Sequence, residues 1–115
     1  MVHHSKRAGV AAVLTWLACL ANPVSADELA VKRGAALFAT HCLGCHAAGP
    51  GNVGTTMLAN RLGPQRSVLA DRGDLDPIFT ATMVRYGIGV MPGFRPSEIT
   101  DEELVDLAAY LGRNR

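Results

Sequence analysis

The clearest hydrophobic pattern lies near the C-terminus, where apolar residues recur at intervals of three or four. These residues are Leu104, Leu107, Ala108 and Leu111. Thr100 and Glu103, which precede the pattern, form the sequence signature of a capping box, and Ile99 can pack against the first turn. Gly112 follows the last apolar position and is a common helix terminator. The pattern therefore predicts an amphipathic helix between Thr100 and Gly112.

A second helix is expected from about Glu28 to Thr40. Its alanines favour helix formation, but Gly34 interrupts it at a cost of about 1 kcal/mol relative to alanine. A glycine inside a helix often marks the close approach of another backbone, and Phe38 lies four residues further along on the same face. We expect this face to pack against the C-terminal helix, so that the two helices cross.

The middle of the chain predicts one more long helix. Asp76 and Pro77 are typical of a helix start, and Gly87 after Tyr86 is expected to end it. Its inward face is expected to consist of Ile78, Phe79, Thr82 and Met83. Residues 47–73 are rich in glycine and predict at most one or two short helical turns. The pattern as a whole predicts an all-α protein with three main helices.

Residues 1–26 have the three zones of a secretory signal peptide, which separates them from the folded domain at 27–115. Lys6 and Arg7 precede an apolar stretch that is too short to span a bilayer comfortably. Small residues directly before Asp27 favour cleavage at that point. We therefore expect a cleaved leader and no membrane-spanning segment in the mature chain.

Removal of this leader changes the composition of the domain that folds. Two of the 11 Lys and Arg residues and none of the 10 acidic residues lie in the leader, so the acidic residues slightly outnumber the basic ones in the mature chain. This balance gives no reason to expect nucleic acid as a partner. Cys19 also lies in the leader. A cysteine near the end of an apolar stretch can be a lipid attachment site, but the large aromatic residue Trp16 fits such a site poorly. The mature domain keeps Cys42 and Cys45, and is small enough to need more than side chains for its core.

Both remaining cysteines belong to a C-x-x-C-H motif at residues 42–46, a spacing typical of haem attachment. Two thiols one helical turn apart can add to the vinyl groups of a haem, and His46 can then take one axial position on the iron. A zinc site would need more ligands than His41 could add, and a thioredoxin-like site would need a strand-helix-strand pattern. The motif therefore indicates covalent haem.

Met91 is the candidate for the other axial position. It begins the segment M-P-G-F at residues 91–94, and a thioether is the usual second ligand in an electron-transfer cytochrome. Met1, Met57 and Met83 lack this Met-Pro context. The sequence therefore favours Met91 over the other methionines.

Because the chain has both the C-x-x-C-H motif and the later Met-Pro segment at Met91, residues 28–112 resemble the small class I c-type cytochromes. The resemblance implies an all-α fold in which three main helices surround one covalently bound haem c, and the N- and C-terminal helices cross. It implies thioether bonds to Cys42 and Cys45. The iron would be ligated by His46 and Met91.

The chain departs from this family near the axial histidine. Many relatives carry a Gly-Pro-x-Leu segment whose proline carbonyl holds the free ring nitrogen. This chain has no proline at the corresponding place, so either Thr55 or Pro50 is expected to supply the carbonyl. Arginine and tyrosine are common partners of haem propionates, which makes Arg61, Tyr86 and Arg95 candidates for that role.

The resemblance implies an electron carrier rather than an enzyme, because an iron with both axial positions filled cannot easily bind substrate. The alternative is a haem enzyme or gas sensor, which would need an open sixth position. Bacterial haem attachment takes place outside the cytoplasmic membrane, so we expect the protein in the periplasm. The Met-Pro-x-Phe loop and the run at 95–101 resemble cytochrome subunits that accept electrons from flavoprotein dehydrogenases, such as those that oxidise 4-cresol. Electrons would then pass to the respiratory chain.

An uncharged patch is expected where the haem edge approaches solvent. Its members are Leu43, Gly44, Ala47, Ala48, Val90, Pro92, Gly93 and Phe94. An exposed apolar patch often marks a contact site, here one for redox partner proteins. The alternative is that Val90 and Phe94 point inward and seal the haem crevice.

Overall fold

The structure, a computed structural model, describes residues 25–115, so nearly all of the expected leader, with Cys19, lies outside the described residues. The described part of the chain contains five α-helices and two short 3-10 helices, joined by loops. They are α1 (Ala26–His41), α2 (Leu43–His46), α3 (Val53–Leu62), η1 (Pro64–Arg66), η2 (Leu69–Asp71), α4 (Pro77–Tyr86) and α5 (Asp101–Leu111). The expected all-α fold is confirmed. None of the described helices has the length and apolar character needed to cross a lipid bilayer.

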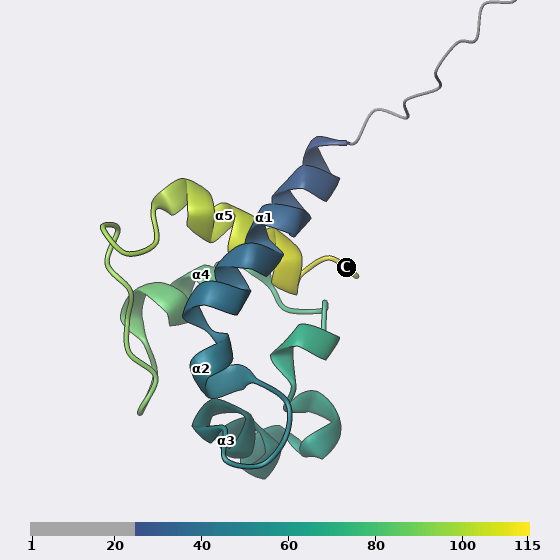
Figure 1. Cartoon of the computed structure of the whole chain (residues 1–115), viewed down its shortest axis with the longest axis vertical. Coiled ribbons are helices and arrows are strands. Elements are labelled where there is room, and N and C mark those ends of the chain that lie inside the picture. The colour runs from purple at the N-terminus through teal and green to yellow at the C-terminus, as the bar shows by residue number, and fades with distance from the viewer. Residues whose placement is uncertain (1–24) are drawn as a thin grey trace, which may run out of the picture.

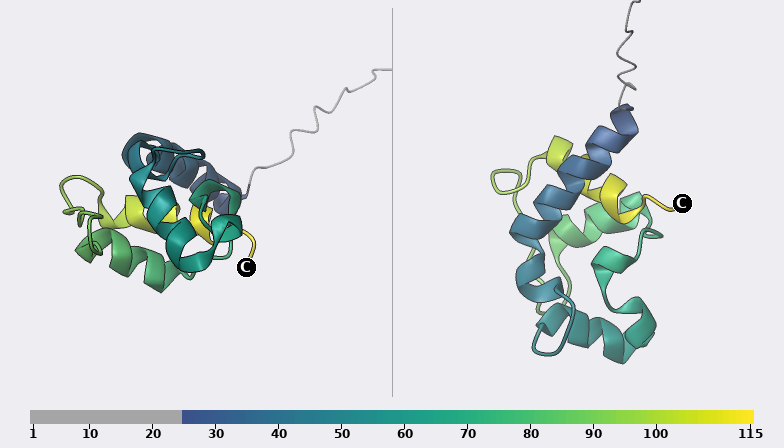
Figure 2. Two further views of the ribbon diagram at one scale, coloured as in Figure 1. Left: turned by 90° about the horizontal axis from the view of Figure 1, so that it is seen from below. Right: turned by 45° about the vertical axis from the view of Figure 1, so that its right-hand side comes forward.

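Helices α1 and α5 cross and form the most extensive helix pair of the fold (Figure 1, Figure 2). At Gly34 a Cβ would overlap the carbonyl oxygen of Asp106 and lie 2.7 Å from the Cβ of Tyr110. Arg33 donates to both carboxylate oxygens of Asp106, at 2.6 and 2.9 Å. The rings of Phe38 and Tyr110 lie 5.7 Å apart. The prediction that Gly34 and Phe38 face the C-terminal helix is confirmed.

The core lies where α1, α4 and α5 meet. The predicted stripe of α5 is buried, and Ile99, directly before this helix, is completely buried. The buried hydrophobic cluster consists of Phe38, Val84, Ile99, Leu104, Leu107 and Leu111. The predicted capping box is also present, because the Thr100 hydroxyl accepts from the N–H of Glu103 and the Glu103 carboxylate accepts from the N–H of Thr100.

Helix α1 begins at Ala26, slightly before the expected start at Glu28, because a capping box forms around Ser25. The Ser25 hydroxyl accepts from the N–H of Glu28 at 3.1 Å, and the Glu28 carboxylate accepts from the N–H of Ser25 at 3.0 Å. Cleavage of the leader before Asp27 would remove this capping serine. The mature chain would then begin inside the first turn of α1.

Helix α3 is longer than the sequence suggested. The prediction of at most one or two short turns within residues 47–73 was wrong, because Val53–Leu62 is a helix of 10 residues. No side chain caps its N-terminus, since the Asn52 amide donates instead to the carbonyls of Ala48 and Gly49. Asn52 is a residue type common at helix starts, but the surrounding glycines Gly49, Gly51 and Gly54 are typical of a loop, which is why the sequence did not reveal this helix. The domain therefore has four long helices rather than three.

Helix α4 has the predicted bounds but only part of the predicted inward face. Ile78 is 78% exposed, and Thr82 is also exposed. Thr80 and Val84 are the residues of this helix that are buried. They lie one helical turn apart, and Val84 belongs to the core cluster that includes residues of α5. Ile78 and Thr82 come two residues before Thr80 and Val84, which places them on the other side of the helix, toward solvent.

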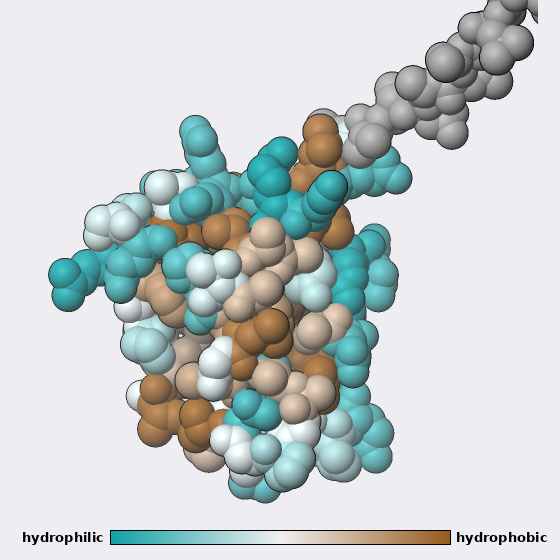
Figure 3. Space-filling view, in the orientation of Figure 1, coloured by the Kyte–Doolittle hydropathy of each residue, from teal (hydrophilic) through white to brown (hydrophobic). Residues whose placement is uncertain are grey.

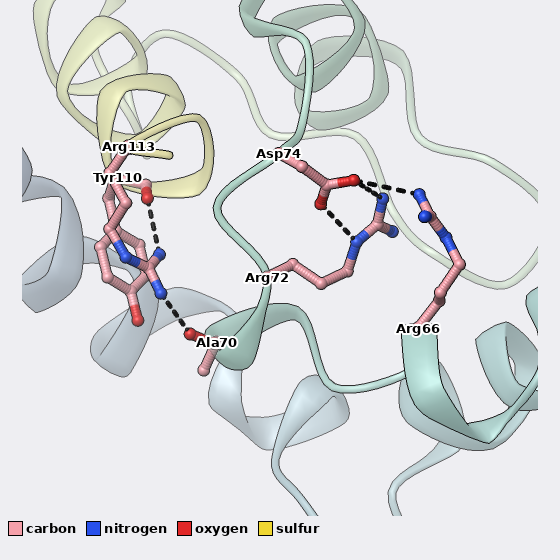
Figure 4. Close-up of polar contacts among 6 residues, drawn as sticks. All are labelled: Arg66, Ala70, Arg72, Asp74, Tyr110 and Arg113. Atoms are coloured by element: carbon pink, nitrogen blue, oxygen red, sulfur yellow. Dashed lines mark hydrogen bonds and ion pairs between the residues drawn. The ribbon is translucent and has the colours of Figure 1, made fainter. Parts of the chain in front are cut away.

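The segment between η1 and α4 is tied to the C-terminus (Figure 4). Arg113 donates to the carbonyls of Ala70 and Tyr110, each at 2.7 Å, and its guanidinium lies 4.5 Å from the centre of the Tyr110 ring. The N–H of Leu75 donates to the carbonyl of Leu111 at 3.0 Å. These contacts hold the segment against α5.

Replacing Gly34 by alanine should lower the free energy of unfolding by about 1–3 kcal/mol, because the added methyl group would overlap the backbone of α5. The matched control is Gly44→Ala, which adds the same atom to an exposed helical position with nothing within 4 Å. The control should change stability by less than about 1 kcal/mol. Guanidinium unfolding of both holoproteins, followed by circular dichroism, measures the difference. Unchanged stability of Gly34→Ala would contradict the close crossing.

Candidate functional site

The C-x-x-C-H motif lies where α1 ends and α2 begins. Cys42 caps the C-terminus of α1, and its N–H donates to the carbonyl of Phe38 at 2.9 Å. The N–H groups of Cys45 and His46 donate back to the carbonyl of Cys42, at 3.1 and 2.9 Å. The two cysteines therefore lie one helical turn apart.

A cavity of about 390 Å³ opens beside this motif. All five α-helices and the segment after α4 contribute to its wall, and Cys42, Cys45, His46 and Met91 all line it. The wall is mostly apolar, and its apolar residues from α3 and α4 include Val53, Met57, Leu58, Leu62, Phe79 and Met83. A mostly apolar cavity with a few polar groups is typical of a cofactor site.

The imidazole of His46 packs against α3. A Cβ on Gly54 would lie 2.6 Å from its Cε1 and 2.7 Å from its Nδ1, so a larger residue at position 54 would displace the ring. Burial lowers the pKa of His46 below its usual value. The ring is therefore neutral near pH 7, the form in which imidazole binds a metal.

The expected carbonyl partner of His46 is not found. Its Nδ1 is buried and has no hydrogen-bond partner among the described residues, so the expectation of a contact from Thr55 or Pro50 was wrong. Thr55 lies inside α3, where backbone carbonyls point along the helix, and its hydroxyl donates to the carbonyl of Ala47 at 2.8 Å. Buried unpaired polar atoms are few in native proteins and often mark functional sites.

The two thiols differ in their surroundings. Cys45 is exposed, whereas Cys42 is partly buried at the junction of α1 and α2. Burial, with a smaller effect of the nearby Cys45, raises the pKa of the Cys42 thiol to about 11. Without a bound group, Cys42 is therefore protonated near neutral pH.

Met91 follows a tight turn after α4. The N–H of Ile88 donates to the carbonyl of Met91 at 3.1 Å, and the N–H of Met91 donates to the carbonyl of Ile88 at 3.0 Å. Gly87 has a φ of +69°, and a Cβ there would overlap the carbonyl oxygen of Met91. Met57 and Met83 also line the cavity. Three thioethers thus face this space, and that of Met91 is the one outside a helix.

Of the three residues expected at the haem propionates, Arg61 lines the cavity and the other two do not. Tyr86 ends α4 and is 83% exposed. Arg95 is exposed in the segment that leads to α5. The structure therefore brings Arg61 together with the motif and leaves Tyr86 and Arg95 apart from it.

Arg72 lines the cavity although the sequence did not single it out. Its side chain is 11% exposed and donates to both carboxylate oxygens of Asp74, which also accepts from Arg66 at 3.1 Å (Figure 4). The hydrogen bond from Arg72 lowers the pKa of Asp74 to about 2. The spacing of Arg72 and Asp74 in the sequence suggests an ion pair, but only the folded structure shows that Arg72 also lines the cavity.

The uncharged patch expected near the haem edge is largely exposed. Figure 3 shows hydrophobic residues gathered over the tip of the segment between α4 and α5, at the lower left. Val90 is 72% exposed. Phe94 is partly buried instead, and its ring meets that of His41 edge-on with centres 5.9 Å apart. Phe94 thus packs inward, whereas Val90 stays largely in solvent.

The donor set fits a haem and does not fit a protein-bound zinc ion. Within residues 25–115, no three His, Cys, Asp or Glu side chains gather where they could hold a metal ion. The cavity instead offers two thiols, a neutral imidazole and several thioethers on an apolar wall. These are the groups that attach a haem and ligate its iron in c-type cytochromes.

Comparisons with known proteins agree with this site. Residues 29–111, which include the motif and Met91, match the family described as cytochrome C oxidase, cbb3-type, subunit III. The chain is 31% identical to cytochrome c6 from Synechocystis sp. over 96 residues, which cover 80% of this chain and 70% of that relative. No solved structure matches it significantly. The chain therefore belongs to the class I c-type cytochromes, which bind one covalently attached haem c.

Proposed function

We propose that this cytochrome is an electron carrier with a haem attached through Cys42 and Cys45 and an iron ligated by His46 and Met91. The observation that supports this most directly is that all four side chains line one apolar cavity. When bound, the haem supplies an iron that alternates between ferric and ferrous states. The residues around the haem would keep His46 and Met91 on the iron in both states. Few atoms would then have to move when one electron is gained or lost.

The chain's own residues explain why electron transfer is favoured over haem catalysis. His46 is neutral, so its imidazole can bind the iron without first losing a proton. Apolar side chains on the cavity wall exclude water from the ring. With Met91 as the second ligand, no position is left for a substrate or a gas, which a haem enzyme or gas sensor would require.

Arg61 and Arg72 are proposed to bind the haem propionates. Both line the cavity, and a guanidinium can bind a carboxylate through two parallel hydrogen bonds. Asp74 holds the Arg72 side chain in place, because its pKa of about 2 keeps it ionised at neutral pH. Tyr86 and Arg95 lie away from the cavity and are not favoured for this role.

We propose the periplasm as the location of the mature protein, with cleavage of the leader before Asp27. The donor is proposed to be a flavoprotein dehydrogenase, and the acceptor a component of the respiratory chain. The largely uncharged exposed surface around Val90 supports docking of a protein partner by apolar contact rather than by charge. The resemblance of the loop at 91–94 to dehydrogenase-linked cytochromes supports the identity of the donor.

Acid-acetone extraction should leave the haem on the protein, because thioether bonds survive this treatment. The intact mass of the exported protein should equal that of residues 27–115 plus one haem. In the double variant Cys42→Ala/Cys45→Ala, which keeps both axial ligands, any bound haem should become extractable. Extractable haem in the unchanged protein would contradict covalent attachment through these cysteines. A mass that begins at Cys19 and includes a lipid would indicate a membrane anchor instead.

Substituting Met91→Ala should abolish the long-wavelength absorption band of a ferric haem with methionine ligation. The reduction potential should fall by more than about 100 mV, within the range of about 0.8 V that axial ligands control. Carbon monoxide and cyanide should then bind readily. Met57→Ala and Met83→Ala are matched controls, because both side chains line the same cavity. Loss of the band in either control, with retention in Met91→Ala, would identify a different ligand.

Replacing Arg72 by glutamine should lower the reduction potential by about 30–100 mV, the effect of one positive charge at roughly 10 Å in an effective dielectric constant of about 20. The sign follows because removal of a positive charge favours the ferric state. Arg95→Gln removes the same charge from an exposed position outside the cavity and should have a smaller effect. Equal shifts in the two variants, measured by redox titration, would argue against Arg72 as a propionate partner.

A further inference from the structure

Arg85, in the last turn of α4, joins three parts of the chain through one side chain. Its guanidinium donates to the carbonyl oxygens of Phe94 at 3.2 Å and Ile99 at 2.7 Å. It also donates to the carboxylate of Asp101 at 2.6 Å. The Arg85 side chain is 16% exposed and does not line the cavity. Arg85 therefore contacts the chain next to the cavity and does not itself face the cavity.

The contacts of Arg85 fall on the segment that carries Met91. Residues 87–100 lie between α4 and α5 and contain neither a helix nor a strand. A backbone hydrogen bond from the N–H of Phe94 to the carbonyl of Val84, at 2.8 Å, joins this segment to α4. Arg85 adds two further attachments, one close behind Met91 and one at the end of the segment.

We propose that Arg85 is a positioning residue that keeps the Met91 segment closed over the haem iron. This inference rests on the proposed role of Met91 as an axial ligand. Removing the guanidinium would leave the carbonyls of Phe94 and Ile99 without the donor that they have in the structure. Unpaired acceptors in a partly buried place favour an opened segment in which water can reach them.

The geometry favours an arginine over a lysine. One terminal nitrogen of Arg85 donates to both carbonyls while the other reaches Asp101, an arrangement that the planar guanidinium provides and a lysine ammonium does not. Asp101 is 86% exposed, so its ion pair with Arg85 contributes little by itself. The two carbonyl contacts therefore carry the positioning effect.

The test compares the ferric holoproteins of Arg85→Gln, Arg85→Lys and Arg95→Gln. Arg95→Gln is the matched control, because it removes the same charge from an exposed position in the same segment. Gly34→Ala is a second control, which weakens the fold at the crossing of α1 and α5, outside the segment. Two quantities are measured for each protein, the intensity of the methionine-iron band and the rate of cyanide binding, which requires Met91 to leave the iron.

Arg85→Gln should bind cyanide about tenfold faster or more, with a weaker methionine-iron band. Arg85→Lys should fall between Arg85→Gln and the unchanged protein, and it also provides the test if the glutamine variant does not fold. Arg95→Gln and Gly34→Ala should stay within about twofold of the unchanged protein, as expected for sites that do not hold the segment.

Unchanged cyanide rates in both Arg85 variants would overturn the proposal. Equal acceleration in Gly34→Ala would also overturn it, because general loss of stability would then explain the effect. Met91→Ala separates this inference from the proposed function. If Met91→Ala keeps the band, the ligand assignment fails; if it loses the band while the Arg85 variants behave normally, only the positioning role fails.

Discussion

The close crossing of α1 and α5 at Gly34 is the constraint on which the rest of the structure depends. The absence of a side chain lets the two backbones meet, and the pairs Phe38–Tyr110 and Arg33–Asp106 then fix the relative position of the helices. Helix α1 ends directly at the C-x-x-C-H motif. The crossing therefore determines where the two thiols and the imidazole of His46 lie relative to the core.

The two sides of the iron would be held by different kinds of structure. On one side, short-range backbone hydrogen bonds of α2 and the contact of α3 at Gly54 fix His46. On the other side, Met91 belongs to a segment without regular structure, which is attached to α4 by a few hydrogen bonds. The methionine side therefore depends more on distant residues, and ligand loss should begin there.

The haem completes a core that the polypeptide leaves small. Within residues 25–115, only Ile99 and Leu107 are large side chains with almost no exposure, and the buried cluster consists of six residues. Apolar side chains of α3 and α4, such as Met57 and Phe79, face the cavity instead of the core. Burying them against a bound ring would stabilise the fold by about 25 cal/mol per Å² of apolar surface removed from water.

The sequence by itself determined the elements with short-range signals: the capping box of α5, the bounds of α4, the glycine of the crossing and the spacing of the motif. It missed α3, which lies in a glycine-rich stretch, and it assigned Ile78 to the inside of α4. Only the tertiary structure decided which face of α4 meets α5 and that Arg72, not Tyr86, reaches the cavity. The physical reason is that caps and spacings act within a few residues, whereas burial depends on which surfaces meet after the helices have packed.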